Sequence, residues 1–188
     1  MRVLEASDDV IIPPKVSAIV KGRKVQIKGP RGVLEQDFSH MRISIKMVAK
    51  KKINVSVWFG RRRDVECMNT TASLIRNMIK GVLYGIRYKM RLVYAHYPII
   101  LNPEPEKRKI TIKNYIGQKR VMRVQYPEGV SVFPSDVKDE IIVEGNDLRN
   151  VSLAAARIHQ KVRVSRQDIR KFLDGIYITD RTTIVPMD

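Results

Sequence analysis

Basic side chains, gathered at a few places along the chain, are the residues whose types and spacing suit binding chemistry. Arg61-Arg62-Arg63 follows an alternating segment and Gly60, so we expect the three guanidinium groups on a connection. Arginine binds phosphate through paired hydrogen bonds, which suits three such groups to a nucleic-acid backbone. A solvated loop or an import signal would show the same run. We favour phosphate contact because the chain as a whole is strongly basic.

A second basic group lies toward the C-terminus. Residues 157–171 hold six basic side chains against Asp168 alone, whereas residues 128–147 hold six acidic ones against Lys138 alone. Because carboxylates repel phosphates, we expect the acidic stretch to face solvent or a protein and the basic stretch to approach RNA. The six basic residues are Arg157, Lys161, Arg163, Arg166, Arg170 and Lys171.

The stretch from Arg166 to Tyr177 mixes basic residues with Phe172 and Tyr177 around Gly175. Folded RNA is recognised through phosphates, 2′-hydroxyl groups and unstacked bases, so basic and aromatic side chains on one short element suit it, and Tyr177 is a candidate contact. The alternative is that both rings belong to the core. We expect Ser165–Asp168 to open a helical turn as a capping box, and Gly175 to permit a sharp turn.

An alternating segment from Tyr88 to Tyr94 supplies the remaining candidates. Its apolar side chains fall on one side, as a strand with one buried face requires. Basic side chains fall on the other side and are candidates for RNA contact. They are Arg87, Lys89 and Arg91.

The sequence carries no motif of a catalytic or metal site. It has no Gly-x-Ser-x-Gly, His-Glu-x-x-His, Cys-x-x-Cys or P-loop. The three histidines lie far apart in the sequence, and Cys67, the single cysteine, has neither a disulfide partner nor the partners of a structural zinc site. We therefore expect no enzymatic activity, no catalytic residue, no cofactor, no metal and no small-molecule substrate.

The composition indicates the class of partner. The 188 residues include 36 Lys and Arg against 19 Asp and Glu, a net charge of +17, with a hydrophobic content of 44% that is ordinary for a globular protein. A folded chain this basic repels itself unless a partner neutralises it, and nucleic-acid phosphate is the usual partner. There are two alternatives: the protein is basic without binding a polyanion, or its partner is an anionic membrane surface. No apolar run approaches the roughly 18 residues of a membrane span and no signal peptide is apparent, so we expect an intracellular protein with no membrane partner.

The elements that position these residues occur twice. Lys24–Gly32 and Lys109–Gly117, which start 85 residues apart, share Lys, Ile, Lys and Gly at the same places. Each copy continues through short β-like segments and a glycine into one helix, expected at Asn69–Gly85 and at Leu148–Gln160. A repeat of this length is long enough for a small domain. We expect an α+β fold of two tandem duplicated domains, each with β-sheets and one long helix around a single core.

Prolines and caps set the expected boundaries. Pro98 and the run Asn102–Pro105 interrupt both helix and strand, so we expect a first domain at residues 1–98 and a second at residues 99–188. Pro13-Pro14 predicts that the first strand begins after them. The expected N-caps are Thr70 or Thr71 for the first helix and Asp147 or Asn146 for the second.

Three stretches of the chain resemble a known family. They are Lys24–Gly32, Asn77–Ile99 and Ile169–Tyr177. Together they resemble the large-subunit ribosomal protein L-six family, most closely its eukaryotic branch, also called L-nine, and the likeness covers essentially the whole chain. The resemblance implies two duplicated domains and a place on the large subunit near the sarcin–ricin loop and the stalk base, where translational GTPases act. It implies large-subunit rRNA and neighbouring ribosomal proteins as partners.

The expected function is therefore that of a structural constituent of the large ribosomal subunit that binds rRNA. The alternative is an RNA-binding assembly factor that is not retained in mature ribosomes. A third class is an RNA-modifying enzyme whose catalytic site the motifs do not reveal. The resemblance implies a cytosolic ribosome, assembled in the nucleus and nucleolus.

Overall fold

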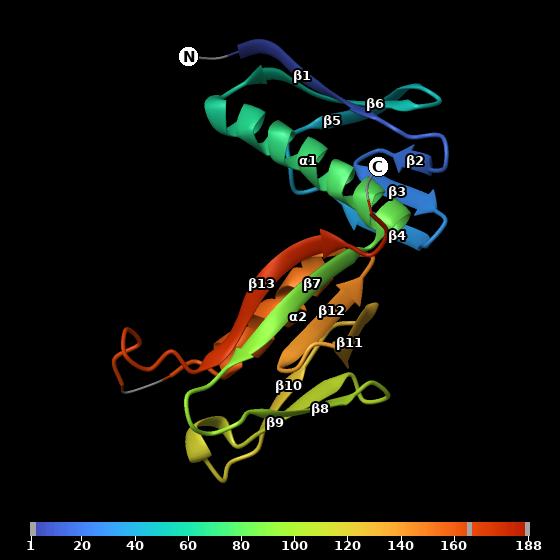
Figure 1. Ribbon diagram of the computed structural model, residues 1–188. Helices are drawn as coiled ribbons and strands as arrows, with labels where there is room; N and C mark the ends of the chain where they lie inside the picture. Colours follow the sequence, from blue (N-terminus) through green and yellow to red (C-terminus); the bar gives the residue numbers. More distant parts are fainter. Residues whose placement is uncertain (1–2, 165–166, 187–188) are drawn as a thin grey trace. The chain divides into compact units, whose positions relative to one another are not determined.

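The structure is a computed structural model of the 188-residue chain, and it describes residues 3–164 and 167–186. The chain divides in sequence between Tyr84 and Gly85 into two compact units, both drawn in Figure 1. Each unit has one hydrophobic core and one long helix. The α+β class predicted from the sequence is confirmed.

The first unit contains two three-stranded antiparallel sheets and the helix α1. One sheet has the strand order β2-β3-β4 and the other has the order β1-β6-β5. The helix α1 packs on β1, β6 and β3. The elements are β1 (Val3–Ile11), β2 (Ser17–Lys21), β3 (Lys24–Gly29), β4 (Gly32–Asp37), β5 (Ser44–Ala49), β6 (Lys52–Gly60) and α1 (Arg62–Tyr84).

The second unit contains a three-stranded sheet, β10-β9-β8, and a four-stranded sheet, β11-β12-β7-β13. The helix α2 covers one face of the four-stranded sheet, behind β7 and β12 in Figure 1. The elements are β7 (Ile86–Val93), β8 (Ile100–Glu104), β9 (Lys109–Lys113), the short 3-10 helix η1 (Tyr115–Gly117), β10 (Met122–Gln125), β11 (Val130–Pro134), β12 (Glu140–Gly145), α2 (Leu148–Lys161) and β13 (Gly175–Thr183).

The strand orders confirm the duplication. The two copies of the repeated motif form β3 and β9, and each is the central strand of a three-stranded sheet. The strand before each helix, β6 or β12, pairs on one side with the preceding strand and on the other with β1 or β7. The second unit adds β13 at the free edge of β7.

This correspondence moves the expected domain boundary. Strand β7 is the counterpart of β1, so it belongs to the second unit, whereas the expected boundary at residues 98 and 99 assigned it to the first. The prolines that suggested that boundary lie within the second unit. Pro103 sits in β8, which is an edge strand, the position in a sheet where proline is tolerated.

Strand β1 was not expected, because it precedes Pro13-Pro14 rather than following them. Asp8 and Asp9 lie in it, and aspartate is depleted in strands. Here both carboxylates have partners on neighbouring elements: Asp8 pairs with Arg76 at 2.7 Å, and Asp9 pairs with Lys52 at 2.8 Å. The hydrogen bond from Lys52, followed by that from Asn54, lowers the pKa of Asp9.

Candidate nucleic-acid interface

The arginine triplet lies at the start of α1. Arg61 precedes the helix, and its carbonyl accepts hydrogen bonds from the N–H of Asp64 at 2.9 Å and of Val65 at 3.2 Å. The Asp64 carboxylate accepts one from the Arg61 N–H at 2.8 Å, as the third helical residue does in a capping box. Arg62 and Arg63 therefore lie in the first turn of α1, which corrects the expectation of a connection.

The helix begins well before the expected Asn69. Thr70 and Thr71, the expected caps, are interior residues whose hydroxyls donate to the carbonyls of Glu66 and Cys67 at 2.9 Å each. The prediction of their capping role was wrong.

The three arginines have different surroundings. Arg62 pairs with Glu66 at 3.0 Å one helical turn on, and its side chain is 93% exposed. Arg61 and Arg63 instead line a hollow of about 580 Å³, together with Arg42, Phe59 and Asp64. The structure thus brings together two of the predicted residues and adds Arg42 and Phe59, which sequence reasoning missed.

Strand β7 presents Arg87, Lys89 and Arg91 away from its buried apolar side chains, as expected. Arg87 forms an ion pair with Glu144 on the adjacent strand β12, so its charge is already neutralised within the unit. Lys89 is half-buried, and Arg91 is exposed. Of the three, Arg91 is the residue best placed to meet a ligand.

Helix α2 carries a basic groove. Asp147 caps the helix through its side chain, which accepts from the Arg149 N–H at 3.0 Å, as expected. Arg157 donates from Nη1 to the Gln125 carbonyl at 3.2 Å and so ties α2 to β10. A hollow of about 400 Å³ lies at this junction. It is lined by Arg123, Val124, Gln125, Arg157, Gln160 and Lys161.

The groove unites Arg157 with Lys161, two predicted residues, while Arg163 is exposed just beyond the end of α2. Sequence reasoning missed Arg123 and Gln160. Arg123 is an exposed side chain of β10, and the alternation Val121-Met122-Arg123-Val124 was a signal for it.

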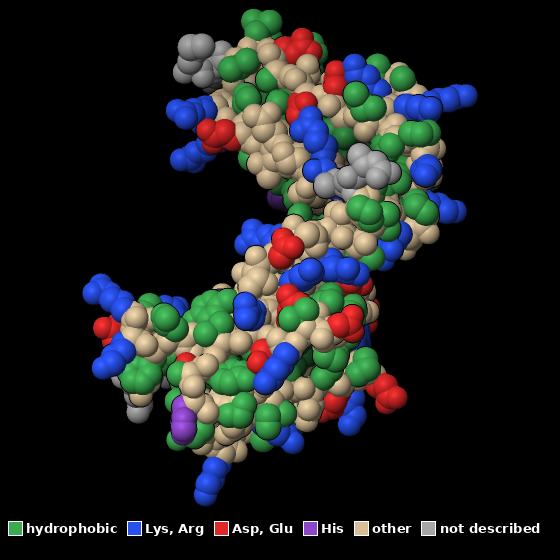
Figure 2. Space-filling view, in the orientation of Figure 1, with side chains coloured by type: hydrophobic (Ala, Val, Ile, Leu, Met, Phe, Trp, Pro, Cys, Tyr) green, Lys and Arg blue, Asp and Glu red, His purple; other side chains and the backbone are tan. Residues whose placement is uncertain are grey.

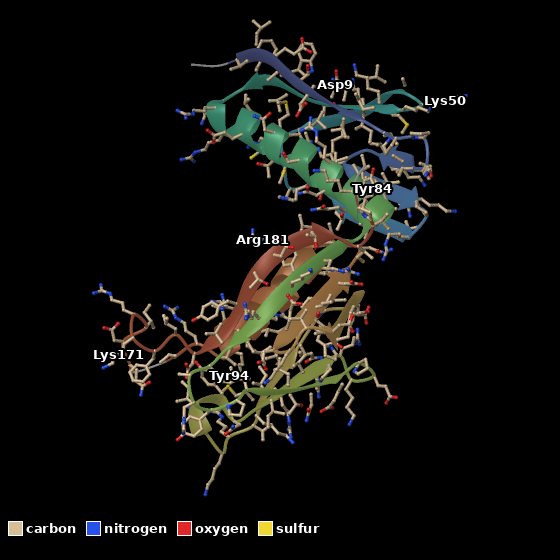
Figure 3. All side chains as sticks on the ribbon, viewed as in Figure 1. Asp9, Lys50, Tyr84, Tyr94, Lys171 and Arg181 are labelled. Atoms are coloured by element: carbon tan, nitrogen blue, oxygen red, sulfur yellow. The ribbon has the colours of Figure 1, made fainter. Side chains whose placement is uncertain are left out.

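The segment between α2 and β13 carries Arg170 and Lys171. Asp168 holds the turn, because its side chain accepts from the Arg170 N–H at 2.9 Å and its carbonyl accepts from the Lys171 N–H at 3.1 Å. Lys171 lies at the outer end of this segment in Figure 3, and Lys and Arg side chains gather there beside hydrophobic ones in Figure 2. Arg166, with the start of the expected capping box, lies outside the described residues.

The base of this segment is anchored at Asp174. Its carbonyl accepts from the Tyr115 hydroxyl at 3.1 Å, and its carboxylate accepts from the Ala95 N–H at 3.2 Å. Burial, followed by the charges of Asp174 and Tyr177, raises the pKa of Tyr115 to about 12. The tyrosine therefore keeps its proton, and with it the hydrogen bond to Asp174, above the pH of 10 at which an ordinary tyrosine is half ionised.

Gly175 has a different role from the one expected. It is the first residue of β13, opposite Val93, and its φ is not in the left-handed region. A Cβ at Gly175 would lie 3.1–3.2 Å from ring atoms of Tyr177, so the glycine makes room for that ring. The ring also stands 5.2 Å from the His159 ring.

Phe172 in this segment and Tyr177 at the start of β13 are both only partly buried. Tyr177 is 38% exposed and Phe172 is 39% exposed. The alternative that both rings are core side chains is therefore wrong.

The acidic stretch has partners within its own unit. Glu144 pairs with Arg87, Glu128 pairs with Arg108, and Asp139 accepts from the Tyr94 hydroxyl at 3.0 Å. That last bond is the largest cause of a raised pKa at Tyr94. The acidic stretch therefore faces outward only in part, because the Glu128 side chain is 83% exposed whereas that of Glu144 is 16% exposed.

Two negative findings apply to residues 3–164 and 167–186. Within them, no helix has the length and apolar character to cross a bilayer. The same residues hold no group of three His, Cys, Asp or Glu side chains arranged to bind a metal ion.

Comparison with known proteins places the chain in a family. Residues 12–85 match the family model of ribosomal protein L6. The chain is 43% identical to large ribosomal subunit protein uL6 of Candida albicans, over 98% of each chain. It is 43% identical to uL6A of Schizosaccharomyces pombe, over 100% of this chain and 98% of the relative. It is 40% identical to uL6 of Staphylothermus marinus, over 92% of this chain and 93% of the relative. With two duplicated α+β units and near-complete coverage of relatives at this identity, the chain belongs to the ribosomal protein L6 family.

Proposed function

We propose that the protein is a structural constituent of the large ribosomal subunit that holds rRNA through its second unit. Members of the L6 family are structural ribosomal proteins and not enzymes, and the relatives named above are large-subunit proteins. A net charge of +17 suits a partner made of phosphate. The partners are large-subunit rRNA and neighbouring ribosomal proteins.

The observation that carries the rRNA assignment is the groove between α2 and β10. Arg157 donates one hydrogen bond to the Gln125 carbonyl, and this bond fixes its guanidinium group. The other N–H groups of the guanidinium can donate to a phosphate. Arg123 and Lys161 line the same groove, as does the amide of Gln160. A groove with three positive charges, one of them held by a hydrogen bond, suits an RNA backbone.

The exposed segment with Arg170 and Lys171 is a second basic surface of the same unit. Both side chains are exposed, and Asp174 and Tyr115 anchor the base of the segment. The stretch Ile169–Tyr177, one of those that resemble the family, covers the end of this segment and the first residues of β13. We place it near the sarcin–ricin loop and the stalk base, in cytosolic ribosomes assembled through the nucleus and nucleolus.

Incorporation of tagged variants into large subunits tests the proposal. Arg157→Ala with Lys161→Ala should lower the amount of protein that co-sediments with large subunits in high salt. Arg149→Ala is the matched control, because Arg149 is an exposed arginine of the same helix that does not line the groove. Equal incorporation of the wild type, the Arg157→Ala/Lys161→Ala variant and the Arg149→Ala variant would contradict RNA binding by the proposed groove.

The salt dependence of binding supplies a second measurement. If about eight phosphates are contacted, the log–log slope of affinity for an rRNA fragment against salt is roughly −7. A slope near zero would contradict an electrostatic interface. Complete absence of the wild-type chain from salt-washed subunits would favour the assembly factor instead.

A further inference from the structure

The end of the first unit where β6 runs into α1 combines an exposed aromatic ring with arginines. Phe59 is 68% exposed and lines the hollow together with Arg42, Arg61 and Arg63. Trp58, its neighbour on β6, is 58% exposed. Aromatic side chains contribute most when they are buried against a partner, so the exposed ring of Phe59 beside three arginines points to a binding surface.

The charge of this hollow is unbalanced. Among the described residues, Arg42, Arg61 and Arg63 form no ion pair, whereas their neighbour Arg62 does. Asp64 is the one acidic side chain of the lining, and one of its carboxylate oxygens already accepts from the Arg61 N–H. The hollow is therefore net positive and fits an anionic ligand.

The backbone holds Phe59 in place. Its φ is 50°, which is an outlier for a bulky side chain and persists only where the surrounding structure fixes it. The next residue, Gly60, packs so closely that a Cβ would lie 2.5 Å from Val57 and 3.3 Å from Asp64. The backbone that carries the exposed ring is therefore closely constrained.

We propose that this hollow binds an unpaired RNA nucleotide, with the base stacked on Phe59 and the phosphate held by Arg42, Arg61 and Arg63. The inference rests on the proposed function, because it takes RNA as the ligand. An aromatic ring stacks on the face of any base, and arginine binds phosphate through two parallel hydrogen bonds. An apolar protein surface would leave the three guanidinium groups buried without partners, which is unfavourable.

Fluorescence of the full-length protein provides a local readout. Trp58 is the only tryptophan of the chain and is adjacent to Phe59. A short single-stranded RNA of mixed sequence should quench this fluorescence, and the same RNA annealed to its complement should quench it less. Equal quenching by both RNAs would overturn the proposal.

Substitution of Phe59 tests the stacking. Phe59→Leu keeps an apolar side chain and should weaken binding of the single strand by about tenfold, whereas Phe59→Tyr should retain it. Because Phe59 is exposed, the thermal unfolding of both variants should match the wild type. An unchanged affinity of Phe59→Leu for the single strand would overturn the stacking. So would subunits with Phe59→Leu that lack a neighbouring ribosomal protein while the variant binds RNA as tightly as the wild type, because Phe59 would then contact a protein.

The arginine triplet contains its own matched control. Arg63→Ala should weaken single-strand binding more than Arg62→Ala, because Arg62 is paired with Glu66 and does not line the hollow. Equal effects would mean that general charge, and not this hollow, binds RNA. If Phe59→Leu has no effect while the Arg157 and Lys161 variant still loses incorporation, this inference fails and the proposed function stands.

Discussion

At Gly175 the second unit leaves room for the ring of Tyr177. Gly175→Ala would place a Cβ 3.1–3.2 Å from that ring, and the ring must shift. This contact opposes the gain of about 0.4–1 kcal/mol that alanine brings over glycine by restricting the unfolded chain. In urea unfolding, Gly175→Ala should therefore give a less favourable change in the free energy of unfolding in the wild-type background than in the Tyr177→Ala background, where the ring is absent. Strict additivity of the two substitutions would show that the contact is unimportant.

Tyr115 gives the second unit a dependence on alkaline pH. Its pKa is raised from 10.0 to about 12 in the folded chain. As the pH rises, the unfolded chain loses this proton first, so the stabilising effect is complete below pH 10 and is lost between pH 10 and 12. Tyr115→Phe should lower the free energy of unfolding at neutral pH and flatten its decline across that window. Parallel declines in the two proteins would contradict this origin.

The candidate binding residues were predictable from sequence only where they are close along the chain. Arg157 and Lys161 stand one helical turn apart, so their spacing placed them on one face. Arg123 joins them because β10 packs against α2, and Arg42 joins Arg61 in the same way. These contacts join residues that lie far apart along the chain, so no local sequence pattern predicts them.

The start of α1 depends on Asp64, which accepts from the Arg61 N–H. Asp64→Ala removes that acceptor and should lower the free energy of unfolding of the first unit by about 1 kcal/mol. Glu66→Ala is the matched control, because it removes only the exposed pair with Arg62, worth about 0.3–0.5 kcal/mol. Denaturant unfolding measures both variants. An equal loss in both would contradict the capping role.

The two helices show why one start was predicted and the other was not. Helix α2 begins at a capping aspartate followed directly by its apolar stripe, so the local signals agree. The first turns of α1 are polar, and its stripe, from Met68 through Ile75 to Val82, becomes evident only later along the helix. The capping residue is also unusual in its position. Asp64, whose carboxylate accepts from the Arg61 N–H, lies inside α1 rather than before it.

For the whole molecule, the repeated motif was sufficient to predict a duplication but not its boundary. The repeat marks β3 and β9, which lie in the middle of each unit. The first strand of each unit, β1 or β7, lies far from its own repeat and pairs with the strand before the helix. That long-range pairing has no local signature, and the prolines within the second unit predict a linker where the structure has none.

Fragments of the chain test the boundary between Tyr84 and Gly85. Strand β7 pairs with both β12 and β13 and buries Tyr88, Met90 and Leu92 in the core. At about 2 kcal/mol for each buried side chain, their loss approaches the whole stability of a small domain, about 5–15 kcal/mol. Residues 85–188 should therefore unfold cooperatively in urea, as should residues 1–84, whereas residues 99–188 should show no cooperative transition. A fragment of residues 99–188 that folded as well as the longer one would restore the boundary at residue 98.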